Sequence, residues 1–277
     1  MSARMEELEV RLLLEAIFDR YHYDFRSYAM ASLKRRLAQA CDSLGTSTLS
    51  GLQERVLHEP ESFSTLLQYL TVQVSDMFRD PEFFLALRKQ VLPVLATWPS
   101  IKVWCAGCST GEEAYSLAIL LAEEGLLDRS IIYATDINAQ SLRSAATGVY
   151  SLERLRGFTE NHRRAGANVS LSNYYHSASG DAAIMDAALR RKITFSDHSL
   201  ATDNVFSELH LITCRNVLIY FDHALQERAL GLFADSLVRG GFLGLGSKES
   251  LRFTAAADSF SEFAGPERLY RRKGAGA

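Results

Sequence analysis

VWCAGCSTGEEAYS, from Val103 to Ser116, joins an apolar strand, a glycine-bearing turn and the start of a helix. The strand Ile101–Ala106 is apolar at most positions, as expected when helices cover both faces of a sheet. Gly107 and Gly111 allow backbone angles that other residues avoid, and the apolar residues of 114–123 favour a helix. This order predicts the first unit of a doubly wound α/β fold, whose ligand lies beyond the carboxyl ends of the strands.

Two acidic residues at the helix start indicate which cofactor the turn accepts. A turn for a pyrophosphate has the spacing G-x-G-x-x-G, and free N–H groups at its helix start bind the negative charge. This turn instead carries Glu112 and Glu113, which would repel a diphosphate and attract an ammonium group. Acids in a first turn also complement the helix dipole without any ligand, so that alternative stays open.

A second strand, within residues 129–138, also ends in an acid. Asp136 follows the glycine turn by about two dozen residues, where a carboxylate can accept the hydroxyls of a ribose. NAD and S-adenosylmethionine share an adenosine, but only the second carries a methionyl amine that the acidic turn would attract. An Asp at a strand end is also an ordinary helix cap. The pattern favours an S-adenosylmethionine pocket, and a dehydrogenase is a distant alternative.

Four motifs in order resemble those of the CheR-type chemoreceptor glutamate methyltransferases. They are VSDMFRDPEFF at 74–84, VWCAGCSTGEEAYSLA at 103–118, ATDIN at 134–138 and ITCRNVLIYFD at 212–222. The stretch YHYDFRSYAMASLKRRL at 21–37 also looks like the family's helical domain, so the resemblance covers nearly the whole chain. It implies a Rossmann-like S-adenosylmethionine-dependent methyltransferase sheet, a small all-α N-terminal domain and a small antiparallel β insertion.

The resemblance also implies an activity and a set of site residues. The enzyme would methylate glutamate carboxylates of chemoreceptors and release S-adenosylhomocysteine, with Arg79 and Tyr220 orienting the carboxylate as catalytic residues. Without the family, Arg79 would be interpreted as a surface salt bridge and Tyr220 as a packed aromatic. Gln73, Ser75 and Ser199 replace the family's usual Asn, Thr and Asn. The implied cofactor-binding residues are Gln73, Ser75, Arg79, Ala106, Gly107, Glu112, Glu113, Asp136, Ser199, Leu200, Arg215 and Asn216.

Apolar spacing predicts how the chain divides into domains. Residues 1–75 contain no convincing strand, and their apolar side chains recur at helical spacing. We expect a helical domain at 1–75, a methyltransferase domain at 76–277 and a β insertion at about 168–192. A hinge is expected at 71–81, where Asp80 would cap a helix that begins with Pro81. The two helical stripes are Leu8, Leu12, Leu13, Ala16 and Ile17, and Leu33, Leu37, Ala40, Cys41 and Leu44.

Basic residues gather in the helical domain at Lys34, Arg35 and Arg36. Residues 19–40 carry five basic and two acidic side chains, a local charge of +3 on a chain whose net charge is −3. By the resemblance, this helix contacts the acidic methylation region of a receptor. A solvated helix face is the alternative, and the overall acidity argues against both nucleic acid and a membrane as the partner.

Composition is that of a globular enzyme with real hydrophobic cores. The 277 residues suggest two domains, and 47% of them are hydrophobic. No apolar run approaches the roughly 18 residues of a membrane span, and the start lacks the apolar core of a signal peptide, so we expect a cytoplasmic protein. We also expect a monomer. The pair Cys105 and Cys108 lacks the second ligand pair of a zinc site, so no metal is expected.

The expected chemistry needs few groups. A glutamate carboxylate with a pKa near about 4.3 is ionised at neutral pH, so methyl transfer requires no general base. Two other functions remain open: a non-catalytic regulator that binds the cofactor, and a methyltransferase for RNA or a small molecule. An RNA substrate would call for a broader basic surface. The receptor, its possible tethering peptide, the pathway and the acid that meets the cofactor amine are not determined by the sequence.

Overall fold

The computed structural model describes residues 3–71, 73–178 and 180–274. The chain forms two compact units. The helical unit holds the residues up to Gln73 together with 200–203 and 220–229, and the sheet unit holds 74–199, 204–219 and the residues from Leu230 onward. Each unit is described by itself. Val72, inside the expected hinge, lies outside the described residues.

Over residues 3–71 the helical unit forms α1 (Ala3–Tyr21), α2 (Met30–Leu44), α3 (Leu49–His58) and α4 (Pro60–Leu70). Helix α1 packs against α3, and α2 packs against α4. The stripe predicted for α2 is buried from Leu33 to Cys41. The stripe predicted for α1 is wrong at Leu8 and Leu12, which are 38% and 48% exposed.

The apolar run of α1 explains that error. Leucines occupy several adjacent positions there, so spacing alone does not determine which side faces the neighbouring helices. The buried apolar residues are Val10, Leu13, Leu14 and Ile17, which recur at i, i+3, i+4 and i+7. The buried face of α1 therefore shares Leu13 and Ile17 with the expected stripe but includes Val10 and Leu14 in place of Leu8 and Leu12.

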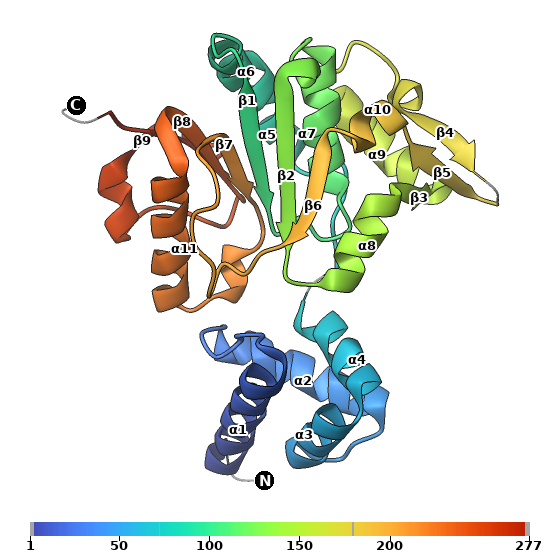
Figure 1. The fold of residues 1–277 in the computed structure, drawn as a ribbon, viewed down its shortest axis with the longest axis vertical. Coiled ribbons are helices and arrows are strands. Elements are labelled where there is room, and N and C mark those ends of the chain that lie inside the picture. Colours follow the sequence, from blue (N-terminus) through green and yellow to red (C-terminus); the bar gives the residue numbers. More distant parts are fainter. Residues whose placement is uncertain (1–2, 72, 179, 275–277) are drawn as a thin grey trace. The chain divides into compact units, whose positions relative to one another are not determined.

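The sheet unit is built on seven strands in the order β6-β2-β1-β7-β8-β10-β9. The first five are mutually parallel, whereas β10 pairs antiparallel with β8 and β9. Figure 1 shows β6, β2 and β1 side by side, with β9 at the far side of the sheet. The strands are β1 (Ile101–Ala106), β2 (Ser130–Asp136), β6 (Ile193–Asp197), β7 (Leu209–Cys214), β8 (Leu237–Leu245), β9 (Phe260–Ala264) and β10 (Leu269–Arg272).

Helices connect these strands, as the doubly wound pattern requires. Residues 223–229 of α11 count with the helical unit. The α-helices are α5 (Pro81–Ala86), α6 (Leu92–Leu95), α7 (Glu112–Glu123), α8 (Ala139–Thr147), α9 (Leu152–Arg164), α10 (Ala187–Arg190) and α11 (His223–Ser236). One π-helical turn, Leu87–Val91, joins α5 to α6, and 3₁₀ turns occur at Leu127–Arg129, Leu171–Tyr174, Leu218–Tyr220 and Ala255–Ser259.

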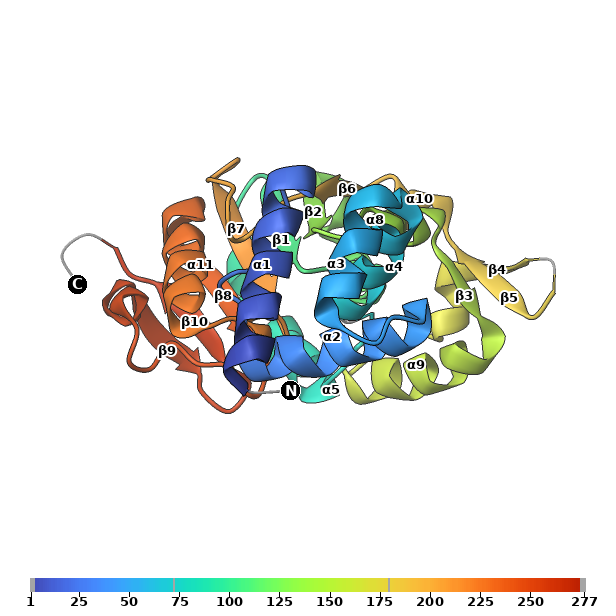
Figure 2. The ribbon, with the colours of Figure 1, turned by 90° about the horizontal axis from the view of Figure 1, so that it is seen from below.

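A small antiparallel sheet accompanies the large one, in the order β3-β5-β4. Its strands are β3 (Val149–Ser151), β4 (Tyr175–Ala178) and β5 (Ala182–Met185). Figures 1 and 2 both place it beside α9, at the β6 side of the sheet unit. Strands β4 and β5 fall inside the insertion expected at 168–192, but β3 precedes it. Only three residues long, β3 offers too little alternation to be recognised from sequence.

The predicted fold class is confirmed: a Rossmann-like sheet, a small all-α N-terminal unit and a small antiparallel sheet are all present. The helix start at Pro81 is also correct, but the predicted cap is wrong. Asp80 adopts a left-handed conformation with φ of 55° and makes no side-chain cap bond. Its carboxylate binds Arg215 instead, because a buried guanidinium offers a stronger partner than the helix N–H groups. Across the residues that the structure describes, no helix has both the length and the apolar character needed to cross a membrane.

Candidate functional site

The turn after β1 requires glycine at two positions. Gly107 and Gly111 have φ of 75° and 92°, in the left-handed region that other residues rarely adopt. A Cβ on Gly107 would collide with Cγ2 of Val217, and one on Gly111 would lie 2.9 Å from Cβ of Ala145. The turn is therefore packed closely on both sides, and its backbone is the surface left for a ligand.

Asp136, at the end of β2, lies directly beside this turn. Its Oδ2 accepts a hydrogen bond from the N–H of Ser109 at 2.8 Å, and its Oδ1 accepts one from the N–H of Asn138 at 2.9 Å. Burial raises the pKa of the Asp136 carboxyl, and these N–H bonds partly oppose the shift. The structure thus brings together the acid and the glycine turn that the sequence singled out separately.

Glu112, the first residue of α7, is fully buried. Its carboxylate lies 2.8 Å from Nη2 of Arg154 and accepts a hydrogen bond from the Thr110 hydroxyl at 2.8 Å. Burial raises its pKa, whereas Thr110 and Arg154 lower it. Arg154 comes from α9, is 40% exposed at its side chain, and also donates to the carbonyl of Ser75. This guanidinium links the helix start to the segment that precedes α5.

Glu113 binds a different arginine, Arg215, at 3.1 Å. The Arg215 side chain is only 1% exposed, donates to the Asp80 carboxylate at 2.7 Å and to the Arg79 carbonyl at 3.0 Å, and lies 4.2 Å from the centre of the Phe83 ring. Arg215 therefore joins the end of β7 to both α7 and α5. Both terminal nitrogens of its guanidinium bind protein acceptors, at a position where the resemblance implied a cofactor contact.

The segment before α5 is fixed to the sheet unit at several points. The N–H of Phe78 donates to the Ser116 hydroxyl at 2.8 Å, and the Asn161 amide donates to the carbonyl of Met77 at 3.1 Å. Phe78 and Asp80 both have positive φ, and Arg79 between them is half-buried. These contacts hold Ser75 and Arg79 in the unit that carries the glycine turn.

Of the residues expected to bind the cofactor or act in catalysis, Gln73, Leu200 and Tyr220 belong to the helical unit. The Gln73 amide donates to the Thr71 hydroxyl at 2.9 Å. The ring of Tyr220 lies 4.3 Å from the guanidinium carbon of Arg36. Ser199 belongs to the sheet unit, where it follows β6.

The basic run on α2 does not form one continuous surface. Arg36 is 3% exposed and donates to the carbonyl of Leu70 at 2.6 Å, so its prediction as a receptor-facing surface residue is wrong. The reason is its position, since it shares the buried face that runs from Leu33 to Cys41. Lys34 lies near the carboxylates of two acidic residues of α1, whereas Arg35 is exposed.

The four cysteines are all buried and unbonded to one another. Burial raises the pKa of Cys105, Cys108 and Cys214 well above the usual value. Within the described ranges 3–71, 73–178 and 180–274, no group of three or more His, Cys, Asp or Glu side chains is arranged to hold a metal ion.

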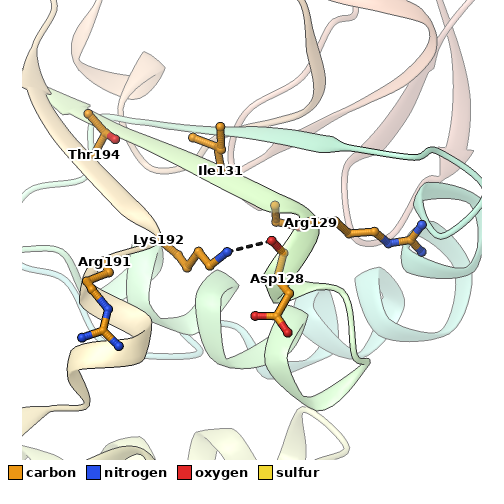
Figure 3. Close-up of a pocket in the computed structure, with 7 residues that line it drawn as sticks. Asp128, Arg129, Ile131, Arg191, Lys192 and Thr194 are labelled. Atoms are coloured by element: carbon orange, nitrogen blue, oxygen red, sulfur yellow. Dashed lines mark hydrogen bonds between the residues drawn. The ribbon is translucent and has the colours of Figure 1, made fainter.

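A hollow of about 580 Å³ lies at the amino-terminal ends of β2 and β6, away from the glycine turn at the carboxyl end of β1 (Figure 3). The Lys192 ammonium donates to the carbonyl of Asp128 at 2.7 Å, and Arg129 donates to the carbonyls of Ala96 and Trp98 at 2.8 Å. Because ligands of doubly wound sheets bind at the carboxyl ends of the strands, this hollow is not the cofactor site.

Two protein-family models match this chain and identify the family to which it belongs. The model described as "CheR methyltransferase, SAM binding domain" matches residues 73–267, and "CheR methyltransferase, all-alpha domain" matches residues 8–71. The chain belongs to the CheR methyltransferase family. It is a methyltransferase whose cofactor is S-adenosylmethionine, as the glycine turn and its acids indicated.

Relatives within the CheR family cover most of the chain. The "Putative methyltransferase Cher3" of Pseudomonas putida is 58% identical over 98% of this chain and 99% of its own length. A "Chemotaxis protein methyltransferase" of Listeria innocua is 31% identical, covering 82% of this chain and 84% of the relative. One of Vibrio parahaemolyticus is 34% identical over 69% of each chain.

Solved structures give only a distant likeness to this CheR-family chain. The glycopeptide N-methyltransferase MtfA complexed with sinefungin has a TM-score of 0.38 and 13% identity, covering 62% of this chain and 50% of that one. A likeness at this level carries no argument about substrate.

Sequence reasoning missed two residues that hold the CheR site together. Arg154 was not recognised because nothing in its local sequence shows that α9 returns to the start of α7. Glu249, in the loop after β8, is a buried acid that binds backbone N–H groups. A signal was available for Glu249: an acid between Gly246 and the apolar Leu251, directly after a buried strand.

Proposed function

We propose that this methyltransferase transfers the methyl group of S-adenosylmethionine to glutamate carboxylates of chemoreceptors, the methyl-accepting chemotaxis proteins. The products would be glutamate methyl esters and S-adenosylhomocysteine, and the reaction would serve sensory adaptation. The observation that carries the proposal is that one chain joins the CheR all-alpha domain at 8–71 to the CheR SAM binding domain at 73–267. The relatives named chemotaxis protein methyltransferase support the same class of substrate.

The two ends of the cofactor have separate candidate residues. Asp136 would accept the ribose hydroxyls, because it ends β2 beside the glycine turn. Glu112 or Glu113 would pair with the methionyl ammonium group, and each already forms an ion pair with a guanidinium. The other proposed cofactor positions are Gln73, Ser75, Arg79, Ala106, Gly107, Ser199, Leu200, Arg215 and Asn216.

The chemistry follows from the charge of the substrate. A glutamate oxygen attacks the methyl carbon in line, the new C–O bond forms as the C–S bond breaks, and sulfur keeps the electron pair of the broken bond. No proton moves, because the carboxylate is already ionised at neutral pH. Arg79 and Tyr220 would orient the carboxylate, so that positioning supplies most of the rate.

The helical unit would provide the receptor-facing surface. Lys34 and Arg35 remain candidates for contact with an acidic receptor segment, with Arg35 the more accessible of the two. Buried Arg36 would act inside the unit, against Tyr220.

Methyl transfer from labelled S-adenosylmethionine to cytoplasmic receptor fragments tests the proposal. We expect base-labile label on fragments from the host's receptors, and none on fragments whose methylatable glutamates are replaced by alanine. Cofactor binding measured by calorimetry, without transfer to any receptor in the panel, would favour a non-catalytic regulator instead.

The two proposed catalytic residues have their own test. Arg79→Ala and Tyr220→Phe should each slow transfer more than about threefold, equivalent to about 0.7 kcal/mol of barrier. Turnover within that limit for both variants would remove them from the mechanism, whatever the substrate.

A further inference from the structure

Glu249 is a buried acid whose partners are backbone N–H groups. Its residue is 4% exposed. One carboxylate oxygen accepts hydrogen bonds from the N–H groups of Gly246 at 2.6 Å and Asn216 at 3.1 Å. The other accepts bonds from Val217 at 2.8 Å and Ile219 at 3.4 Å. A single side chain thus binds the loop after β8 to the turn after β7.

The bound turn has a conformation that needs support. Asn216 has φ of 61°, which is uncommon for a residue with a Cβ. A Cβ on Gly246 would lie 2.7 Å from Oε2 of Glu249 and 2.8 Å from the nitrogen of Asn216, so the two loops approach as closely as glycine allows. Four N–H groups converging on one carboxylate stabilise this close approach.

The same turn contacts the cofactor-binding turn directly. Val217 packs so closely against Gly107 that a Cβ there would collide with it. On the other side of Asn216, Arg215 binds Glu113 at the start of α7. The turn that Glu249 binds therefore contacts the cofactor-binding segment in two ways. One is the apolar contact between Val217 and Gly107, and the other is the ion pair between Arg215 and Glu113.

We propose that Glu249 is a positioning residue of the S-adenosylmethionine pocket. Its carboxylate fixes the turn at 216–219, and that turn holds Gly107 and the backbone around it in the geometry that accepts the cofactor. The proposal needs only the cofactor of the family, so it stands or falls separately from the receptor substrate proposed above.

Glu249→Gln tests this role in the full chain. Glutamine keeps the size of the side chain but has one carbonyl oxygen, so its NH₂ group faces two of the four N–H donors. We expect the dissociation constant for S-adenosylhomocysteine, measured by calorimetry, to rise at least tenfold. Binding within twofold of the unmodified protein, with the variant folded, would overturn the proposal.

Glu123→Gln is the matched control. Glu123 is also an acid of the sheet unit, with a side chain only 6% exposed; it is bound to Arg88 and to His162 and makes no hydrogen bond to either loop. We expect this variant to lower the thermal midpoint but to bind S-adenosylhomocysteine within twofold of the unmodified protein. Equal weakening of binding in both variants would mean that Glu249 acts through general stability, which contradicts a positioning role.

Two further measurements keep the proposal testable if Glu249→Gln does not fold. Gly246→Ala leaves the charge unchanged but pushes on the carboxylate and on Asn216, so it should also weaken binding tenfold or more. In the unmodified protein, the amides of Val217 and Gly246 should exchange with deuterium at least a hundredfold more slowly than exposed loop amides. Rapid exchange at both would overturn the proposal.

Discussion

Glu112 and Glu113 are neighbours at the start of α7, yet the two acids lie in opposite kinds of ion pair. Glu112 is completely buried and its partner Arg154 is 40% exposed, whereas Glu113 is 14% exposed and its partner Arg215 is 1% exposed. The buried acid, Glu112, is therefore paired with an arginine whose guanidinium is accessible to water. The more accessible acid, Glu113, is paired with an arginine that water does not reach. One pair joins the site to the surface, and the other is part of the core.

Of the two arginines, Arg215 should lower the free energy of unfolding more when it is replaced by alanine. The change removes the partner of both Glu113 and Asp80 and leaves a gap against Phe83. We expect the free energy of unfolding to fall by about 3 kcal/mol. Denaturant titration followed by tryptophan fluorescence measures it, since Trp104 lies in β1. A loss below about 1 kcal/mol would show that Arg215 is no more important than a surface pair.

Arg154→Ala should have a smaller effect, because water already reaches this guanidinium. We expect a loss of about 1–2 kcal/mol, most of it from leaving the Glu112 carboxylate buried without its cation. Rising salt should weaken the unmodified Arg154 pair more than the Arg215 pair, because screening acts mainly on exposed charges. If Arg154→Ala costs more than Arg215→Ala, the assignment of surface pair and core pair is reversed.

Lowering the pH should weaken cofactor binding before it unfolds the protein. Burial raises the pKa of Glu112 and of Asp136, so each carboxyl takes up a proton at a higher pH than an exposed acid does. Protonated Glu112 no longer attracts the cofactor's ammonium group, and protonated Asp136 is a poorer acceptor for the ribose hydroxyls. The affinity for S-adenosylhomocysteine should therefore fall severalfold between pH 7 and about pH 5.

Calorimetry across that range checks the sign, and Glu112→Gln should flatten part of the dependence. A constant or rising affinity as the pH falls would exclude Glu112 as the partner of the amine.

Arg35→Ala extends the comparison to the helical unit and should have the smallest effect on stability. Arg35 is exposed and its neighbour Arg36 is buried, so α2 repeats the contrast between a surface and a core arginine. We expect unfolding to change by less than about 0.5 kcal/mol. Receptor methylation should slow a fewfold while cofactor binding is unchanged. Unaltered methylation would leave the basic helix without a role in substrate contact.

Local sequence was sufficient for the features that depend on local backbone chemistry. The glycines of the β1 turn, the acid that ends β2 and the helix that begins at Pro81 all follow from residue types at fixed short spacings. The all-α N-terminal unit followed from helical periodicity. Each of these rests on residues within one turn or one strand–turn–helix unit.

Features that depend on distant partners were not predictable. Asp80 was expected to cap a helix, but it binds Arg215, which lies more than a hundred residues away in the chain. Arg36 was expected to contact the receptor because of the family resemblance, although its spacing from Leu33 placed it on the buried face. Glu249 follows Lys248 in the sequence, but its partners in the structure are backbone N–H groups, which any residue provides and which local sequence therefore does not single out.

The reactivity of the buried thiols around the cofactor turn can be used to measure local opening of the site. Cys105, Cys108 and Cys214 flank the glycine turn and the end of β7, and the pKa of each is raised by burial, so almost no thiolate is present to react. Alkylation of these sulfurs then requires local opening of the site. The rate of carbamidomethylation by iodoacetamide, read by mass spectrometry, measures that opening directly, and bound S-adenosylhomocysteine should slow it.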